Sequence, residues 1–212
     1  MESPLEQYVL DHTSPDEQAL TWIEHQTFVK THYPQMLSGR VKMRLLRIIA
    51  GACRAGRILE IGTFTGYSAA AFALALPDGG HIDTYEINDE METLIREGWR
   101  RAGVEPKITL HIGDALKILP RTADVPYDMA YIDANKREYP AFFEAVLPLV
   151  RKGGLIVVDD TLMGGKVVET PRPSDAQTEG LAALGDLLRS DSRIELVTLP
   201  LHDGLTIARK LQ

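Results

Sequence analysis

The segment Arg57-Ile-Leu-Glu-Ile-Gly-Thr-Phe-Thr-Gly-Tyr-Ser68 decides the fold of this chain. Its first five residues, 57–61, contain three branched aliphatic side chains, which is typical of a buried parallel strand. Gly62 and Gly66 then frame a turn, and segment 68–76 is rich in strong helix formers. A strand that leads through a glycine loop into a helix N-terminus is a common way to hold a nucleotide-like ligand.

The spacing in this loop is Glu-x-Gly-x-x-x-Gly, whereas dinucleotide-binding folds use Gly-x-Gly-x-x-Gly. Glu60 at the strand end would repel a pyrophosphate but suits a cationic ligand. S-adenosylmethionine is such a ligand, because it carries a sulfonium and an ammonium group and no phosphate. The alternative is a plain strand–loop–helix unit in which the glycines serve only turn geometry.

The rest of the chain alternates strand and helix. Repeated βα units predict an α/β, Rossmann-like sheet that is mostly parallel and has helices on both faces. The last two strands form a hairpin across His202-Asp203-Gly204 and add an antiparallel strand. The seven expected strands are 57–61, 81–86, 107–112, 127–133, 155–158, 194–199 and 205–209, and the expected helices of this part are 68–76, 90–102, 139–150 and 175–189.

Residues 1–54 precede the first strand and are expected to form a helical cap. Ser14-Pro15-Asp16-Glu17 is a helix-start signal within a mostly helical segment 3–33, and a further helix follows Ser38-Gly39. The cap either packs on the sheet or covers the ligand, with Val41, Lys42 and Met43 lining the site. The length of 212 residues predicts one domain, 1–212, with the cap followed by a core over 55–212. In the second cap helix, the residues expected on one apolar face are Val41, Leu45, Ile48 and Ile49.

Composition narrows the class of partner. The net charge is −7 and no block of Lys or Arg stands out, which argues against a nucleic-acid partner. Cys53 is the single cysteine, so an internal disulfide is excluded, a reducing compartment is indicated, and the thiol is expected to be buried. The chain shows no signal-peptide pattern and no apolar run of membrane-spanning length, so we expect a cytoplasmic protein without a membrane partner.

Polar residues end the predicted strands, and ligands of such sheets bind beyond those ends. Glu86 ends the second strand, where an acid can accept hydrogen bonds from ribose hydroxyls. Asp114 and Ala115 follow the third strand and could face an adenine edge, although Asp114 could equally be a helix N-cap.

Three carboxylates, Asp133, Asp159 and Asp160, follow the fourth and fifth strands. Like charges this close repel one another unless a cation offsets them, and oxygen-only ligands favour a hard metal. The sequence therefore predicts a divalent metal site, Mg²⁺ first, with Mn²⁺ or Ca²⁺ open. The alternative is that Asp159 and Asp160 only cap a loop.

Several motifs occur together in one order. The chain resembles the class I S-adenosylmethionine-dependent O-methyltransferases of the caffeoyl-coenzyme A and catechol O-methyltransferase family, bacterial type, from about Leu37 to Lys210. The motifs that carry this resemblance are Glu60–Ser68, Gly113-Asp-Ala115, Tyr131-Ile-Asp-Ala-Asn-Lys136, Val157-Val-Asp-Asp160 and Asp203–Ala208.

The resemblance implies a role for each matching residue, and it implies a homodimer. Asp133, Asp159 and Asp160 would hold the metal, and Lys136 would be the catalytic base, with Asp133 also at the reacting centre. The residues that would bind or line the cofactor site are Val41, Met43, Glu60, Gly62, Tyr67, Ser68, Glu86, Asp114, Ala115 and Asp133, with Tyr67 near the transferred methyl group.

The implied reaction moves a methyl group from S-adenosylmethionine to a hydroxyl of a catechol-like or other phenolic small molecule. The metal would lower the pKa of the reacting hydroxyl, and Lys136, with its own pKa depressed by that cation, would take the proton. Without the resemblance, Lys136 would be interpreted as a solvated lysine. Alternatives are an NAD-dependent oxidoreductase, which lacks its glycine motif here, and a non-catalytic cofactor-binding protein.

The sequence departs from the family at two positions. Asp160 stands where the family usually has asparagine, which adds negative charge to the site. Met163 stands where a tryptophan is common, which leaves the shape of the acceptor pocket open.

Overall fold

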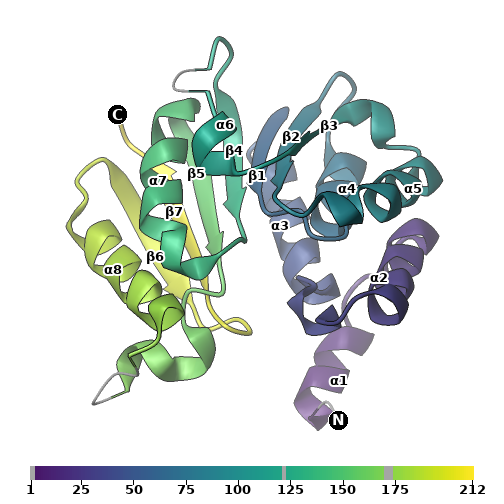
Figure 1. Cartoon of the computed structure of the whole chain (residues 1–212), viewed down its shortest axis with the longest axis horizontal. Helices are drawn as coiled ribbons and strands as arrows, with labels where there is room; N and C mark the ends of the chain where they lie inside the picture. Colours follow the sequence, from purple (N-terminus) through teal and green to yellow (C-terminus); the bar gives the residue numbers. More distant parts are fainter. Residues whose placement is uncertain (1–2, 121–122, 170–173) are drawn as a thin grey trace.

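A seven-stranded sheet forms the centre of the protein, seen in a computed structural model that describes residues 3–120, 123–169 and 174–212 (Figure 1). The strand order is β3-β2-β1-β4-β5-β7-β6, and β7 alone runs against the others. The expected Rossmann-like sheet with its antiparallel closing strand is therefore confirmed. The strands are β1 Arg57–Ile61, β2 His81–Glu86, β3 Ile108–Ile112, β4 Tyr127–Ile132, β5 Val150–Asp159, β6 Ile194–Leu199 and β7 Leu205–Lys210.

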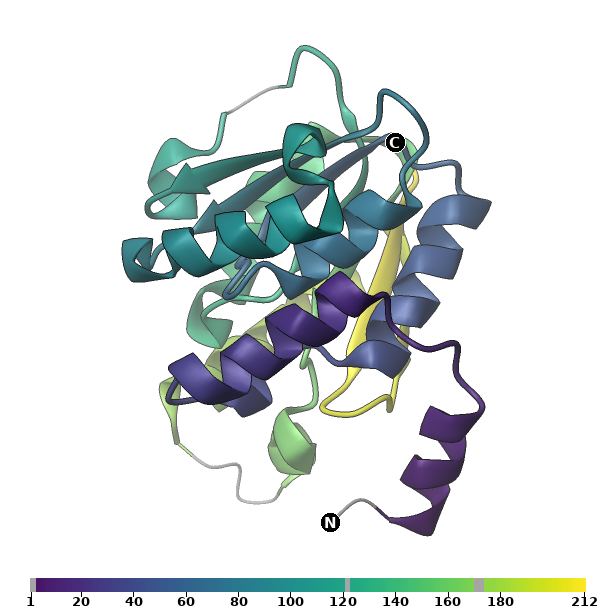
Figure 2. The same cartoon turned by 90° about the vertical axis from the view of Figure 1, so that its right-hand side faces the viewer.

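Helices cover both faces of the sheet. Helices α2, α3, α4 and α5 lie on one side, and α6, α7 and α8 lie on the other (Figures 1 and 2). The α-helices are α1 Pro4–Asp11, α2 Gln18–Lys30, α3 Arg40–Ala52, α4 Tyr67–Ala75, α5 Glu92–Ala102, α6 Ala115–Ile118, α7 Tyr139–Val146 and α8 Ala176–Ser190. Short 3₁₀ helices span Pro34–Met36, Asp89–Met91, Glu105–Lys107, Lys136–Glu138, Leu147–Leu149 and Met163–Val168. Among the described residues, no helix combines the length and apolar character that crossing a membrane would need.

Two apolar cores result because successive side chains of a strand point to opposite faces. Ile58 of β1 packs with α2, α3, α4 and α5, whereas Leu59 and Ile61 pack with α7 and α8. Helices α2 and α3 share the first core with the sheet, so the expected cap is packed onto the sheet over much of its length. Helix α1 projects from the body and buries no residue (Figure 1).

The expected helix start at Ser14 is wrong. Residues 14–17 belong to no helix and α2 begins at Gln18, while Ser3 caps a separate first helix. Tertiary contacts hold this segment: Arg47 donates two hydrogen bonds of 2.8 Å to Glu17, and the Tyr67 hydroxyl donates to Asp16. These contacts override the local start signal.

The buried face of α3 also differs from the expectation. Ile48 is 64% exposed, whereas Lys42, Met43, Leu46 and Ala50 are buried. The buried stripe includes a lysine, which a search for apolar spacing leaves out. Just beyond this helix Cys53 is exposed, so the expectation of a buried thiol was wrong as well.

The glycine pair after α7 has a different role from the expected one. Gly153 and Gly154 lie inside β5, which already begins at Val150, rather than ending a helix. Gly153 has φ +75°, and the register of β5 against β4 shifts between Tyr127 and Met129. The glycines therefore allow an irregularity within the strand.

Candidate active site

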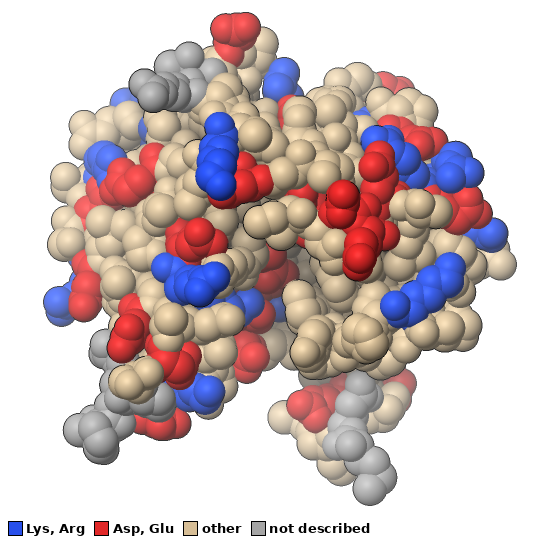
Figure 3. Space-filling view, in the orientation of Figure 1, with Lys and Arg blue, Asp and Glu red and all other residues tan. Residues whose placement is uncertain are grey.

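A cavity of about 610 Å³ opens at the carboxyl ends of the parallel strands, in the hollow between the two halves of the molecule (Figure 3). Its volume lies in the range of small-molecule and cofactor sites. The cavity brings together most of the residues predicted from the sequence. Those that line it are Gly62, Tyr67, Ser68, Glu86, Asp114, Ala115, Asp133, Lys136 and Asp160.

The glycine loop passes directly against the chain that follows β4. Gly62 has φ +89°, and a Cβ atom there would lie 2.1 Å from the carbonyl oxygen of Asp133. Gly66 has φ +84° and caps α4, and its carbonyl accepts a hydrogen bond of 2.9 Å from Trp99 Nε1. Both positions require glycine, and the close approach brings the loop into contact with the backbone of Asp133.

Glu86 holds the same loop from β2. Its Oε2 accepts a hydrogen bond of 2.7 Å from the backbone N–H of Phe64, and its Oε1 accepts one of 2.9 Å from that of Asn88. Asp114 Oδ1 accepts a hydrogen bond of 3.0 Å from the N–H of Leu116. Asp114 is therefore the N-cap of α6, and it lines the cavity as well.

Tyr67 connects the cavity wall to the segment before α2. Its hydroxyl donates to Asp16, and its ring lines the cavity. Burial, together with that carboxylate, raises the pKa of Tyr67 well above its usual value. The phenol is therefore neutral over the physiological pH range.

Four predicted site residues, Val41, Met43, Glu60 and Asp159, are not among those that line the cavity. Met43 is packed in the first core. Glu60 is fully buried, accepts a hydrogen bond of 2.5 Å from Thr84 Oγ1, and has a pKa raised by burial. Contact of these residues with a cofactor stays a prediction. The segment Gln35–Ser38, which sequence reasoning missed, lines the cavity instead.

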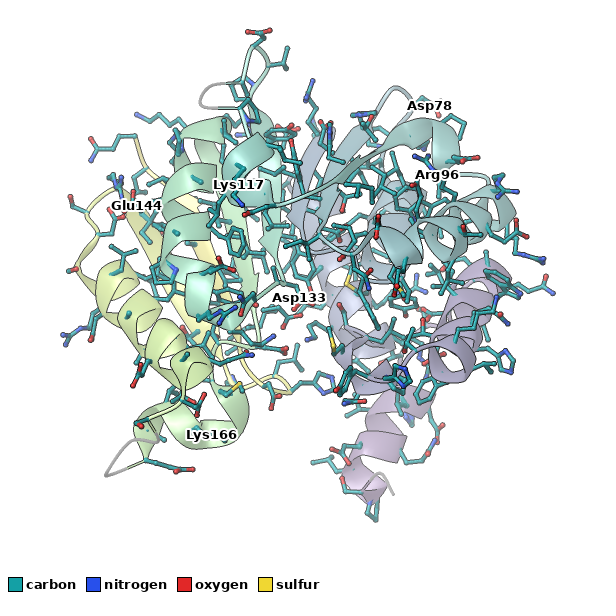
Figure 4. The ribbon with its side chains drawn as sticks, viewed as in Figure 1. Asp78, Arg96, Lys117, Asp133, Glu144 and Lys166 are labelled. Atoms are coloured by element: carbon teal, nitrogen blue, oxygen red, sulfur yellow. The ribbon has the colours of Figure 1, made fainter. Side chains whose placement is uncertain are left out.

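Lys136 reaches the cavity from the chain after β4, close to Asp133, which lies between the two halves of the molecule in Figure 4. Lys136 Nζ is 3.0 Å from Asp160 Oδ2 and 3.8 Å from Asp133 Oδ1. Burial alone would lower the pKa of Lys136, but the two carboxylates outweigh it and raise the pKa. The expected lowering of the pKa assumed a metal ion beside Lys136 and stays a prediction, whereas the carboxylates by themselves favour the ammonium form.

A second lysine, Lys42 of α3, is buried and does not line the cavity. Its Nζ is 2.7 Å from Asp159 Oδ1, 2.6 Å from Asp159 Oδ2 and 3.5 Å from Asp160 Oδ1. Burial opposes the charged form of Lys42, yet the Asp159 and Asp160 carboxylates raise its pKa. Burial and the neighbouring Asp159 carboxylate raise the pKa of Asp133 to about 7.

The three acids therefore gather as expected, but with lysines as their counter-ions. Among the described residues, no three Asp, Glu, His or Cys side chains are arranged to hold a metal ion. Both oxygens of Asp159 are taken by Lys42 and by further donors, and Asp160 is paired with Lys136. As it stands, this donor set does not fit the divalent ion that the sequence predicts.

Known proteins match the chain over nearly its whole length. The model of a family described as O-methyltransferase matches residues 10–211. The catechol O-methyltransferase domain-containing protein 1 of Mus musculus is 35% identical, over 99% of this chain and 81% of its own. The caffeoyl-CoA O-methyltransferase of Stellaria longipes is 33% identical, over 98% of this chain and 90% of its own.

Solved structures agree with this assignment. The O-methyltransferase TomG from Streptomyces achromogenes, solved in complex with S-adenosylmethionine, has a TM-score of 0.91 at 30% identity and covers 98% of this chain and 96% of its own. The O-methyltransferase from Bacillus cereus, in complex with S-adenosylhomocysteine, has a TM-score of 0.90 at 26% identity, covering 98% of this chain and 97% of its own. The matches extend over nearly the whole chain, including the sheet, the glycine loop and the cavity. The protein is therefore a member of the O-methyltransferase family and an S-adenosylmethionine-dependent enzyme.

Proposed function

We propose that the enzyme transfers the methyl group of S-adenosylmethionine to a phenolic, catechol-like hydroxyl of a small molecule. The observation that carries the proposal is one continuous cavity with two different walls. The glycine loop and Glu86 form one side, and Lys136 with Asp133 and Asp160 forms the other. The names of the matched relatives, which refer to catechol and to caffeoyl-CoA, support a phenolic acceptor.

The cofactor side supplies polar groups of the expected kinds. Glu86 would accept hydrogen bonds from the ribose hydroxyls while it holds the Phe64 amide. Asp114 and Ala115 would meet the adenine, and Gly62, Tyr67 and Ser68 would surround the methionine part. Because the loop is fixed by backbone hydrogen bonds, these residues mainly contribute alignment of the sulfonium for in-line displacement.

The acceptor side combines apolar side chains with the ammonium group of Lys136. Leu37, Phe142 and Met163 line the cavity and can pack on an aromatic ring, and Lys136 lines it too. In the transfer, the bond from sulfur to the methyl carbon breaks and a bond from the hydroxyl oxygen to that carbon forms. The hydroxyl proton leaves to water, and the Lys136 ammonium stabilises the oxygen's developing negative charge. S-adenosylhomocysteine is the second product.

The proposed transfer does not use the divalent metal ion that the sequence predicts. The carboxylates that would hold Mg²⁺, namely Asp133, Asp159 and Asp160, are matched by lysines in the structure.

A homodimer also remains a proposal, and exposed apolar side chains near the N-terminus support it. Leu5 is 72% exposed, Tyr8 59% and Phe28 60%, and helix α1 has no buried residue in the single chain. A second copy would cover such a surface. Sedimentation velocity tests this, and a monomer at micromolar concentration would exclude it.

The methyl transfer is tested by measuring S-adenosylhomocysteine released with catechol and with 1,2-dimethoxybenzene, which has no free hydroxyl. We expect product only with catechol and only when enzyme and cofactor are both present. If the protein binds S-adenosylhomocysteine but methylates no phenol, the acceptor class is wrong. If no acceptor of any class is methylated, the non-catalytic alternative is favoured.

A further inference from the structure

We propose that the buried ammonium group of Lys42 takes the place of a divalent cation among Asp133, Asp159 and Asp160, so that this enzyme works without a metal. The claim about the ion site concerns the free protein and does not depend on the acceptor. Only its consequence for turnover rests on the proposed function.

The first support is the coordination of Asp159, which is complete. Its Oδ1 accepts from Lys42 Nζ at 2.7 Å and from the backbone N–H of Asp160 at 2.8 Å. Its Oδ2 accepts from Lys42 Nζ at 2.6 Å and from the Tyr131 hydroxyl at 2.5 Å. Each oxygen thus has two donors, which uses its lone pairs, and a metal ion could bind only by displacing the lysine.

The second support is that Lys42, if a metal ion displaced it, would lose the carboxylate partners of its ammonium group. The residue is 4% exposed, and within the described parts of the chain its ammonium group bonds only to Asp159 and Asp160. A divalent ion on these carboxylates would leave a buried ammonium group without a partner and beside a like charge. Burying an unpaired charge is strongly unfavourable, so the lysine and the metal exclude each other.

The third support is the charge balance of the whole cluster. Asp160 is paired on its other oxygen with Lys136, at 3.0 Å, and has φ +53°, a left-handed conformation that points to a constrained position. Two lysines therefore already face the three carboxylates. The Asp160 carboxylate bridges the two ammonium groups.

Lys42 does not line the cavity, so it is a positioning residue rather than a catalytic one. Its ion pair fixes Asp159 and Asp160, and Asp160 in turn holds Lys136 at the cavity wall. The cation that can meet the acceptor oxygen is then the Lys136 ammonium group. The reaction keeps electrostatic stabilisation, supplied by the chain's own side chains.

The test measures binding of Mn²⁺ alone, by electron paramagnetic resonance, to the wild type, Lys42→Met and Lys42→Met/Asp159→Asn. Lys152→Met is the control, because Lys152 is exposed and lies at the far end of β5. We expect no bound Mn²⁺ in the wild type or the control, stoichiometric binding in Lys42→Met, and loss of that binding in the double variant. Turnover of the wild type with catechol should be unchanged by chelation.

Stoichiometric Mn²⁺ binding by the wild type that Asp159→Asn removes would overturn the proposal, and so would loss of wild-type turnover on chelation. A folded Lys42→Met protein without Mn²⁺ binding would overturn it as well. If Lys42→Met does not fold, the two wild-type measurements still decide. Failure of methyl transfer with every phenol would leave the Mn²⁺ result intact, so the two proposals fail separately.

Discussion

Replacing Glu86 separates its structural role from its role in cofactor binding. The carboxylate is 8% exposed, lines the cavity and accepts hydrogen bonds of 2.7 and 2.9 Å from the amides of Phe64 and Asn88. Phe64 has φ +50°, a conformation that is unusual for a residue other than glycine. Glu86→Ala should therefore loosen the glycine loop and also remove the partner expected for the ribose hydroxyls.

The magnitude follows from the number of hydrogen bonds lost. Hydrogen bonds to a charged group contribute about 1.5–3 kcal/mol each, and water can replace part of this at the half-buried Phe64 amide. We expect Glu86→Ala to lower the free energy of unfolding by about 2–3 kcal/mol. We expect its affinity for S-adenosylhomocysteine to fall by about 1–3 kcal/mol, or roughly 5- to 150-fold. Glu86→Gln, which keeps one acceptor oxygen, should fall between the wild type and Glu86→Ala.

Isothermal titration with S-adenosylhomocysteine and urea denaturation measure the two effects separately. Glu90→Gln is the matched control, because Glu90 is exposed, follows the same strand and does not line the cavity. The control should match the wild type in both measurements. Wild-type affinity in a folded Glu86→Ala protein would refute the assignment of Glu86 to the ribose.

Three further predictions concern the loop, the accessible lysine and pH. Gly62→Ala should lower the free energy of unfolding by more than about 3 kcal/mol, because its Cβ would clash with a backbone carbonyl, whereas Gly79→Ala, at φ +77° in open space, should cost only about 1–2 kcal/mol; equal losses in urea denaturation would contradict this. Lys136→Met should lower kcat by about 10²–10³-fold, while Lys136→Arg, which keeps the positive charge, should retain part of the wild-type kcat. Equally low kcat values in the two variants would instead indicate that Lys136 acts as a neutral base. Burial would raise the pKa of Asp128, but the guanidinium of Arg151 and two backbone amides outweigh it and lower the pKa. The ionised Asp128 carboxylate therefore stabilises the folded state above about pH 4, and this contribution is lost as pH falls further. Asp128→Asn should be less stable than the wild type at pH 7 and equal to it at low pH. A difference in urea midpoint that does not change with pH would contradict the assignment.

Much of the site could be predicted because strand ends are a property of local sequence. Glu86 ends β2, and Asp114 and Asp133 come just after β3 and β4. In a parallel sheet those strand ends meet at one edge. The glycine loop could be recognised in the same way, since Gly62 and Gly66 both adopt positive φ. Chain position alone therefore brings these residues to one cavity.

The site residues that could not be predicted depend on contacts between distant parts of the chain. Lys42 and Asp159 are 117 positions apart, and nothing near Lys42 in the sequence marks it as buried. Apolar spacing predicted that Ile48 faces the core, yet the ion pair draws Lys42 inward and leaves Ile48 64% exposed. A buried charge is stable only with its partner, so its position cannot be predicted until the partner's position is known.

The same ion pairs explain why the pKa of Lys136 is raised here, whereas the sequence predicts a lowered pKa with a metal ion beside it. The sequence predicts three acids at one sheet edge, whose negative charge needs a compensating cation. A metal ion was the predicted cation. A divalent ion beside Lys136 would favour its neutral amine, whereas carboxylates without such an ion favour the ammonium form. The buried Lys42 ammonium group compensates the charge of Asp159. Asp133 and Asp160 are then the nearest charges to Lys136. The sign of the pKa shift of Lys136 therefore depends on which cation neutralises Asp159.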